Sequence, residues 1–233
     1  MIAGPDPLRT GNEQEDSTMK IAIIGTGNVG SALGGAFTRA GHDVTFAAQD
    51  AAKTQTIATG LGASAAGDAV EAATAADVIV LAIPFAEVEA VASEIAAASA
   101  GKVLVDVTNP LKPDYSGLAT DGGPSGAERV AAAAPNARVV KAFNTLFASV
   151  QADPTAGGRT VDGLYAGDDA DAKATVAELS RSIGLRPVDA GRLADARGLE
   201  AMAWLNIALQ LRTGGSWNTA FVLVNAPEAA LAA

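Results

Sequence analysis

The sequence has no cysteine, a single histidine and an aromatic content of only 4%. Without cysteine the chain forms no disulfide, thiolate metal site or cysteine nucleophile. With only one histidine, a Ser-His-Asp triad and a zinc site are also disfavoured. That histidine, His42, stands between an expected helix end and an expected strand, so we interpret it as a turn residue. The acidic group Asp168, Asp169 and Asp171 is better explained as a helix start than as a metal site, so no metal is predicted.

Basic residues are scarce, with 16 Lys and Arg against 26 Asp and Glu, a net charge of -10. A nucleic-acid partner is not expected, because phosphate contacts need a basic face. No apolar run is long enough to span a bilayer, so no membrane association is expected. Residues 1–18 contain no apolar h-region and are predicted to form a disordered extension rather than a signal peptide. The cytoplasm is the expected location.

Apolar segments of strand length alternate with helical segments over the first part of the chain. The expected strands cover residues 21–24, 44–48, 62–65, 77–83, 103–107 and 138–142. Expected helices follow the first strand, cover residues 68–75 and 87–98, and end at Ala134. This alternation predicts an α/β fold with a doubly wound parallel sheet, the Rossmann arrangement, over residues 19–145. Ligands of such sheets bind at the carboxyl ends of the strands.

From Leu146 the pattern changes, and residues 146–233 are expected to form a small C-terminal α/β part packed on the Rossmann domain. Its expected elements are strands over 163–167 and 185–188, a helix ending at Ser182, a long helix over 195–211 and an edge strand within 217–224. The long helix is apolar nearly all round, which predicts burial on every side. In a chain of 233 residues this indicates packing against a second subunit.

The most specific motif is Gly-Thr-Gly-Asn-Val-Gly at residues 25–30, directly after the first expected strand. It has the form G-x-G-x-x-G, and the apolar residues that follow it recur at helical spacing. In this context Gly25 allows the tight turn, Gly27 lets the backbone approach a pyrophosphate, and Gly30 lets helix and strand pack closely. The motif therefore predicts a dinucleotide site at the helix N-terminus.

Six further segments resemble one known family. They are Leu-Ala-Ile-Pro-Phe at 81–85, Val-Asp-Val-Thr-Asn-Pro-Leu at 105–111, Val-Val-Lys-Ala-Phe-Asn-Thr at 139–145, Ala-Gly-Asp-Asp at 166–169, Gly-Leu-Arg-Pro-Val-Asp-Ala-Gly at 184–191 and Ala-Arg-Gly-Leu-Glu at 196–200. With residues 24–30 they cover nearly the whole chain in order. Together they resemble the NADP oxidoreductases dependent on the deazaflavin coenzyme F420. The cytosolic domain of eukaryotic metalloreductases looks similar, and the pyrroline-carboxylate reductases do so more distantly.

This resemblance implies a homodimeric enzyme, dimerised through the C-terminal helix, that passes a hydride between NADP(H) and a deazaflavin ring. It assigns the pyrophosphate to Gly25, Thr26, Gly27, Asn28 and Val29, and the adenosine half to Ile83, Pro84 and Phe85. It places the nicotinamide near Asn109 and Pro110, and both rings near Ala142, Phe143 and Asn144. Catalysis would then consist of positioning the two rings.

The sequence departs from the family where the 2′-phosphate of NADP would bind. The family typically has Ser-Arg after the second strand, whereas this chain has Ala48-Gln49 followed by Asp50. Asp50 suits a ribose 2′-hydroxyl and would repel a 2′-phosphate. Lys53 could supply a positive charge, and it could equally be a solvated helix residue. NADP is expected as the cofactor, with NAD as a competitor.

Other functions stay open at this stage. Lys141 and Asn144 are weak candidates for catalysis, and Lys141 or Tyr165 would be essential in an imine or carbonyl reductase. A reductase that passes electrons through ordinary flavin to metal ions is a second alternative. A non-catalytic dinucleotide sensor is a third.

Overall fold

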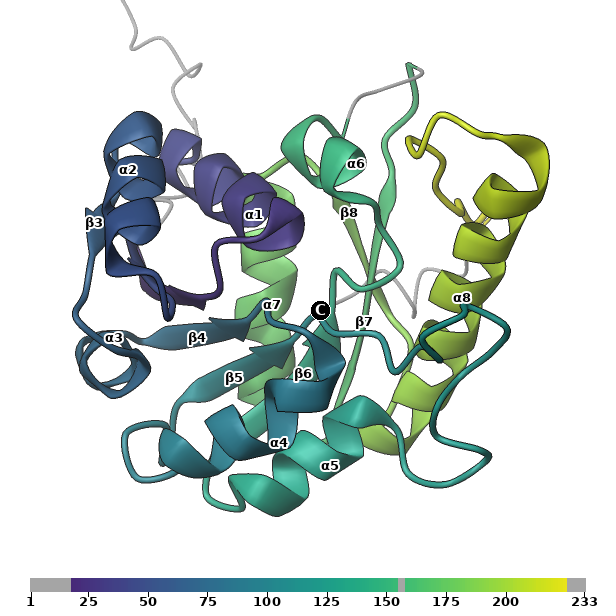
Figure 1. Ribbon diagram of the computed structural model, residues 1–233. Coiled ribbons are helices and arrows are strands. Elements are labelled where there is room, and N and C mark those ends of the chain that lie inside the picture. Colours follow the sequence, from purple (N-terminus) through teal and green to yellow (C-terminus); the bar gives the residue numbers. More distant parts are fainter. Residues whose placement is uncertain (1–17, 155–157, 226–233) are drawn as a thin grey trace, which may run out of the picture.

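The computed structural model describes residues 18–154 and 158–225, so most of the expected N-terminal extension, 1–18, lies outside the described residues. One sheet of eight strands runs through the molecule in the order β3-β2-β1-β4-β5-β6-β7-β8 (Figure 1). The strands are β1 Lys20–Ile24, β2 Asp43–Ala47, β3 Ser64–Ala65, β4 Val78–Leu81, β5 Val103–Asp106, β6 Arg138–Ala142, β7 Asp162–Gly167 and β8 Arg186–Asp189. All neighbouring strands are parallel except β6 and β7. This confirms the predicted α/β sheet fold.

Helices cover both faces of the sheet. They are α1 Asn28–Arg39, α2 Ala51–Leu61, α3 Ala69–Ala75, α4 Phe85–Glu94, α5 Gly126–Ala133, α6 Ala148–Ala152, α7 Ala170–Ser182 and α8 Ala196–Thr213, with a 3-10 turn at Leu193–Asp195. Alternate residues of β1 point to opposite faces: Ile21 and Ile23 pack with α1 and α7, while Ala22 and Ile24 pack with α3 and α4. A strand buried on both faces reads as a continuous apolar run. None of the helices in the described ranges is long and apolar enough to cross a membrane.

The C-terminal part continues the same sheet. Strand β7 pairs antiparallel with β6, for example Lys141 opposite Ala166, and β8 pairs parallel with β7. The polar connection after Leu146 contains the short helix α6, which the sequence did not predict. The functional division at residues 145 and 146 stays a prediction.

The expected edge strand within 217–224 is wrong, because residues 217–225 form no strand. Side chains rather than a backbone ladder hold this segment. The Leu223 backbone N–H donates to Asp162 Oδ2 at 2.6 Å, and Arg186 Nη2 donates to the Leu223 carbonyl oxygen at 2.7 Å. With their hydrogen bonds directed to side chains, these backbone groups do not extend the sheet.

The prediction that the long helix α8 is buried on every side is also wrong within one chain. Its polar residues Glu200, Asn206 and Gln210 are buried, whereas the side chains of Leu205 and Leu211 are 46% and 52% exposed. Asn206 and Gln210 find partners on Thr219. The helix therefore turns its polar face inward and presents leucines outward.

Candidate functional site

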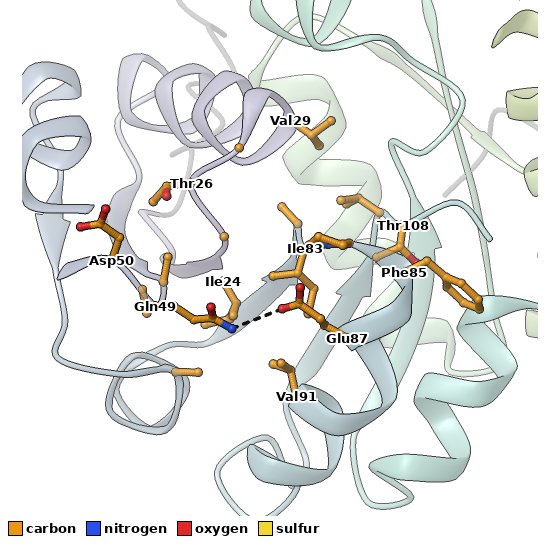
Figure 2. Close-up of a pocket in the computed structure, with 18 of the residues that line it drawn as sticks. Ile24, Thr26, Val29, Gln49, Asp50, Ile83, Phe85, Glu87, Val91 and Thr108 are labelled. Carbon is orange, nitrogen blue, oxygen red and sulfur yellow. Dashed lines mark hydrogen bonds between the residues drawn. The ribbon is translucent and has the colours of Figure 1, made fainter. Parts of the chain in front are cut away.

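A pocket of about 750 Å³ lies at the carboxyl ends of β1, β2, β4 and β5, where the sheet topology places a ligand site. Gln49 and Asp50 lie on one side of it, and Phe85 and Thr108 lie on the other (Figure 2). Most of the predicted cofactor-binding residues line this pocket: Gly25, Thr26, Gly27, Asn28, Val29, Gln49, Lys53, Ile83, Pro84, Phe85 and Asn109. The structure thus gathers residues from four strand ends into one cavity.

The three glycines of the turn between β1 and α1 are not required for the same physical reason. Gly25 has a φ of +117°, and a Cβ there would stand 2.2 Å from the carbonyl oxygen of Ala82. A Cβ on Gly30 would stand 2.1 Å from the carbonyl oxygen of Gly25. Gly27 has an ordinary φ of −74°, and a Cβ there would meet no described atom within 4 Å. Protein packing explains the first and third glycines, and the open pocket explains Gly27.

The N-terminus of α1 has no side-chain cap and no acidic residue in its first turn. In contrast, side chains cap four other helices: Asp50 on α2, Asp68 on α3, Ser125 on α5 and Asp169 on α7. Free N–H groups at a helix N-terminus attract an anion. The uncapped helix and the side-chain-free face of Gly27 fit the pyrophosphate of a dinucleotide.

The segments after β2 and β4 form the side of the pocket where the sequence predicts the adenosine. Asp50 accepts a hydrogen bond from the Lys53 backbone N–H at 2.9 Å and begins α2. The Gln49 amide donates to Glu87 Oε2 at 3.4 Å across the pocket (Figure 2). Ile83, Pro84 and Phe85 continue from β4 into α4, with Pro84 at its N-cap. This side therefore combines an apolar wall with exposed polar groups.

At the other end, Asn109 after β5 and Asn144 after β6 hold each other. Asn109 Nδ2 donates to the Asn144 carbonyl oxygen, and Asn144 Nδ2 donates to Asn109 Oδ1, both at 2.9 Å. Phe143 has a φ of +60°, an uncommon conformation for a bulky residue, and is fully buried with its ring edge against Phe37. Of the residues predicted near the nicotinamide, Asn109 lines the pocket, whereas Pro110, Ala142, Phe143 and Asn144 do not.

Lys141 lies in the interior, below this end of the pocket. Its Nζ donates to Asp106 Oδ2 at 2.8 Å, to Glu200 Oε1 at 2.9 Å and to the Thr108 carbonyl oxygen at 2.5 Å. Burial raises the pKa of the Glu200 carboxyl, and the nearby Lys141 opposes that shift. With three acceptors on its ammonium, Lys141 is placed to hold the Thr108 turn rather than to protonate a ligand.

The remaining candidate groups also lie away from the pocket. His42 Nδ1 accepts from the Met19 backbone N–H, and its Nε2 lies 2.9 Å from Ser182 Oγ. Tyr165 is buried, which raises its pKa to about 12. Asp169 caps α7, and Asp168 accepts from the Leu193 N–H. Within the described ranges, no group of three His, Cys, Asp or Glu residues could hold a metal ion.

Some lining residues were not predicted from the sequence: Gly67, Asp68, Ala69, Glu87, Val91, Glu94 and Val107. The first three follow β3, which has only two residues and gave a weak signal. The acidic ones on α4 looked like ordinary surface residues. Glu87 and Glu94 are seven residues, about two turns, apart, so both lie on the helix face toward the pocket.

Comparisons with known proteins identify the family of this chain. Residues 20–110 match the family model of the coenzyme F420-dependent NADP oxidoreductases. The F420-dependent NADP reductase of Methanothermobacter marburgensis is 34% identical over 228 residues, covering 90% of this chain and 100% of that protein. A solved F420-dependent NADP reductase structure from Arthrobacter sp. FB24 superposes with a TM-score of 0.80 at 33% identity, over 89% of this chain and 100% of that one.

The rat metalloreductase STEAP3 is 34% identical over 184 residues, 78% of this chain. The chain spans only 36% of that protein's length. The F420-dependent reductases match along their whole length, and the family model covers β1 to β5 with the glycine turn. The chain therefore belongs to the family of coenzyme F420-dependent NADP oxidoreductases.

Proposed function

We propose that this protein transfers a hydride between NADP(H) and coenzyme F420, a deazaflavin. The observation that carries the proposal is the pocket itself. It joins the open face of Gly27 and the uncapped α1 at its centre to Asn109 at the far end, in a chain of this family. The reductases of Methanothermobacter and Arthrobacter, matched over nearly the whole chain, support the same activity.

Different lining residues would bind different parts of the nucleotide. The N–H groups of Asn28 and Val29 at the start of α1 would bind the pyrophosphate, and Ile83 to Phe85 would contact the adenosine. Thr108 and Asn109, backed by Asn144 and Lys141, would position the nicotinamide. When bound, the nicotinamide and deazaflavin rings supply the two carbons between which the hydride passes. The chain's part is to hold those carbons about 3–3.5 Å apart and to exclude water.

The pocket offers no proton donor at the expected nicotinamide end. Among the described lining residues there is no His, Cys or Tyr, and the one lysine, Lys53, lies on the adenosine side. Reduction of a carbonyl or imine needs a proton donor beside the substrate, whereas hydride exchange between two rings does not. This favours the deazaflavin reaction over the imine or carbonyl reductase.

We further propose that the protein forms a homodimer through α8. Leu205 and Leu209, one turn apart, are exposed on the same side of this helix, and Leu211 is exposed near its C-terminal end. The helix lies at the end of the molecule opposite α2 (Figure 1). Exposed leucines grouped on one helix mark an interaction surface. We expect the second subunit to cover this face and the C-terminal part to complete the acceptor site. The cytoplasm stays a prediction of the sequence.

The test mixes the protein with NADPH and oxidised F420 and follows the bleaching of the visible absorption of F420. Rapid bleaching is expected. Nucleotide binding without bleaching would overturn the proposal and favour the flavin-dependent reductase if free flavin is reduced instead, or the sensor if it is not.

A further inference from the structure

The adenosine end of the pocket is acidic. Asp50, Asp68, Glu87 and Glu94 line it, and Lys53 is the one basic residue beside them. No arginine lines the pocket anywhere in the described chain. Selectivity for NADP over NAD normally rests on an arginine that grips the 2′-phosphate with two hydrogen bonds. The wall that would have to supply this contact carries negative charge instead.

The segment after β2 lies where the 2′ position of the ribose is read. In this fold an acidic residue about 20 positions beyond the glycine motif accepts from the ribose 2′-hydroxyl. Asp50 follows β2 at that distance, is exposed, and lines the pocket. Only its Oδ1 is engaged, by the Lys53 backbone N–H. The Asp50 carboxylate therefore has a free oxygen for a hydroxyl and would repel a phosphate.

Gln49 does not compensate for this charge. Its amide nitrogen donates to Glu87 Oε2 at 3.4 Å, so a second carboxylate stands directly beside it (Figure 2). A neutral amide gives a 2′-phosphate neither the charge nor the fork of donors that an arginine gives. Gln49 and Glu87 thus form a polar pair suited to uncharged ribose hydroxyls.

Lys53 is the lining residue that could attract a 2′-phosphate. It lies in the first turn of α2 and is exposed, with no ion pair to its ammonium among the described residues. However, an exposed ammonium on a flexible chain is strongly hydrated and binds as a single point charge. The pocket lining carries four carboxylates against this one ammonium. Lys53 alone is therefore a weak source of selectivity.

We infer that this site has lost the family's strong preference for the 2′-phosphate and binds NAD(H) with an affinity within about tenfold of that for NADP(H). The inference rests on the proposed function for the location of the nucleotide, and it deepens that function by naming the second nucleotide. Asp50, Gln49 and Glu87 are its specificity-determining residues.

The first experiment titrates the protein with NADPH and with NADH, without F420, and follows nucleotide fluorescence. We expect the Kd for NADH to be no more than about tenfold above that for NADPH, a difference of about 1.4 kcal/mol. Tighter NADPH binding by more than that factor overturns the inference. Binding of neither nucleotide overturns the proposed site, and the inference with it. If both nucleotides bind but the F420 assay described above shows no bleaching, the proposed reaction is overturned and the inference stands.

Two variants locate the effect. Asp50→Asn removes the charge and keeps the helix cap, because asparagine caps as well as aspartate. It should shift the ratio of affinities several-fold toward NADPH, and Gln49→Arg should shift it about tenfold or more. Asp43→Asn is the matched control, since Asp43 is an exposed carboxylate at the opposite end of the same strand. An equal shift in the control would show a general charge effect and overturn the assignment.

Lys53→Met completes the set. If NADPH binding depends on Lys53, this variant will lose affinity for NADPH by about tenfold or more and leave NADH unchanged. That result would show a working phosphate contact and overturn the inference. An affinity for NADPH that is the same in Lys53→Met and in the parent protein supports the inference.

Discussion

Gly27 occupies the one position of the glycine turn where no protein atom forbids a side chain. Its φ is ordinary, and a Cβ there would meet no described atom within 4 Å. Any cost of a larger residue must therefore arise from what binds beside it. This makes Gly27 the residue whose substitution best separates binding from folding.

Gly27→Val should abolish binding of NADPH and NADH while leaving the thermal midpoint of unfolding within a few degrees of the parent. The isopropyl group would fill the space in which the pyrophosphate approaches α1. Nucleotide fluorescence and circular dichroism measure the two properties. Gly60→Val is the control, because Gly60 on α2 also has open space at its Cβ position. Retained nucleotide binding in Gly27→Val would show that the pyrophosphate lies elsewhere.

Lys141 is a second residue with a separable role. Its ammonium and the carboxylates of Asp106 and Glu200 are all buried, with exposures of 0% and 1% at the side chains. Lys141→Met leaves both carboxylates without their cation, and should lower the free energy of unfolding by about 3–5 kcal/mol. Urea denaturation at neutral pH measures it. A loss below about 1 kcal/mol would mean that water reaches the site.

At the scale of elements, a charged cap joins α5 to α8. Glu128 Oε2 accepts from the Ser125 backbone N–H at 2.7 Å, and both Glu128 oxygens accept from Arg197, at 2.8 and 2.7 Å. The hydrogen bond from Arg197, followed by those from Ser125, lowers the pKa of Glu128 to about 2. Since the folded pKa lies below the ordinary value of 4.5, this cap contributes stability above about pH 4.5 and loses it as the pH falls toward 2.

Glu128→Gln should therefore lower the thermal midpoint of unfolding at pH 6, and the difference from the parent should vanish as the pH approaches 2. Arg197→Met should show the same convergence, because it removes the other partner. Calorimetry across this pH range gives the comparison. A difference that stays constant with pH would mean that the carboxylate charge contributes nothing.

At the scale of the whole molecule, the outward face of α8 has no partner within the described chain. Leu205, Leu209 and Leu211 are 46%, 36% and 52% exposed, and Trp217 after the helix is 42% exposed. Leu205 and Leu209 are four residues apart and share one side of the helix, whereas Leu211, two residues after Leu209, points to another side near the helix end. Their inward neighbours are polar, so the helix cannot simply rotate to bury them.

Leu205→Glu should convert a dimer into a monomer, because a carboxylate at the centre of an apolar interface is left without water or a partner. Size-exclusion chromatography with light scattering measures the mass. Val70→Glu is the control, since Val70 is 38% exposed on α3, far along the chain from α8. A parent protein that is already monomeric would contradict the proposed dimer.

The amino-acid sequence by itself determined the central strands and the nucleotide turn. Strands β4 and β5 were predicted within a few residues of their observed bounds, because a strand buried on both faces is largely apolar. Strand β6 was predicted at its observed bounds although it contains the buried Lys141. The turn at residues 25–30 was predictable because Gly25 and Gly30 meet local backbone and packing demands and Gly27 completes the spacing of a known motif. Local patterns of this kind need no knowledge of distant contacts.

Tertiary structure decided what depends on residues far apart in the chain. The sequence of α8 suggested burial on all sides. Its buried polar residues are instead hydrogen-bonded to Thr219, Lys141 and Gly126, which the helix contacts only in the folded protein. The tail after Trp217 was predicted as a strand, and Asp162 and Arg186 hold it instead. The acidic wall of the pocket likewise exists only because the segments after β2 and β3 and the helix α4 come together at one edge of the sheet, where separate carboxylates share one field.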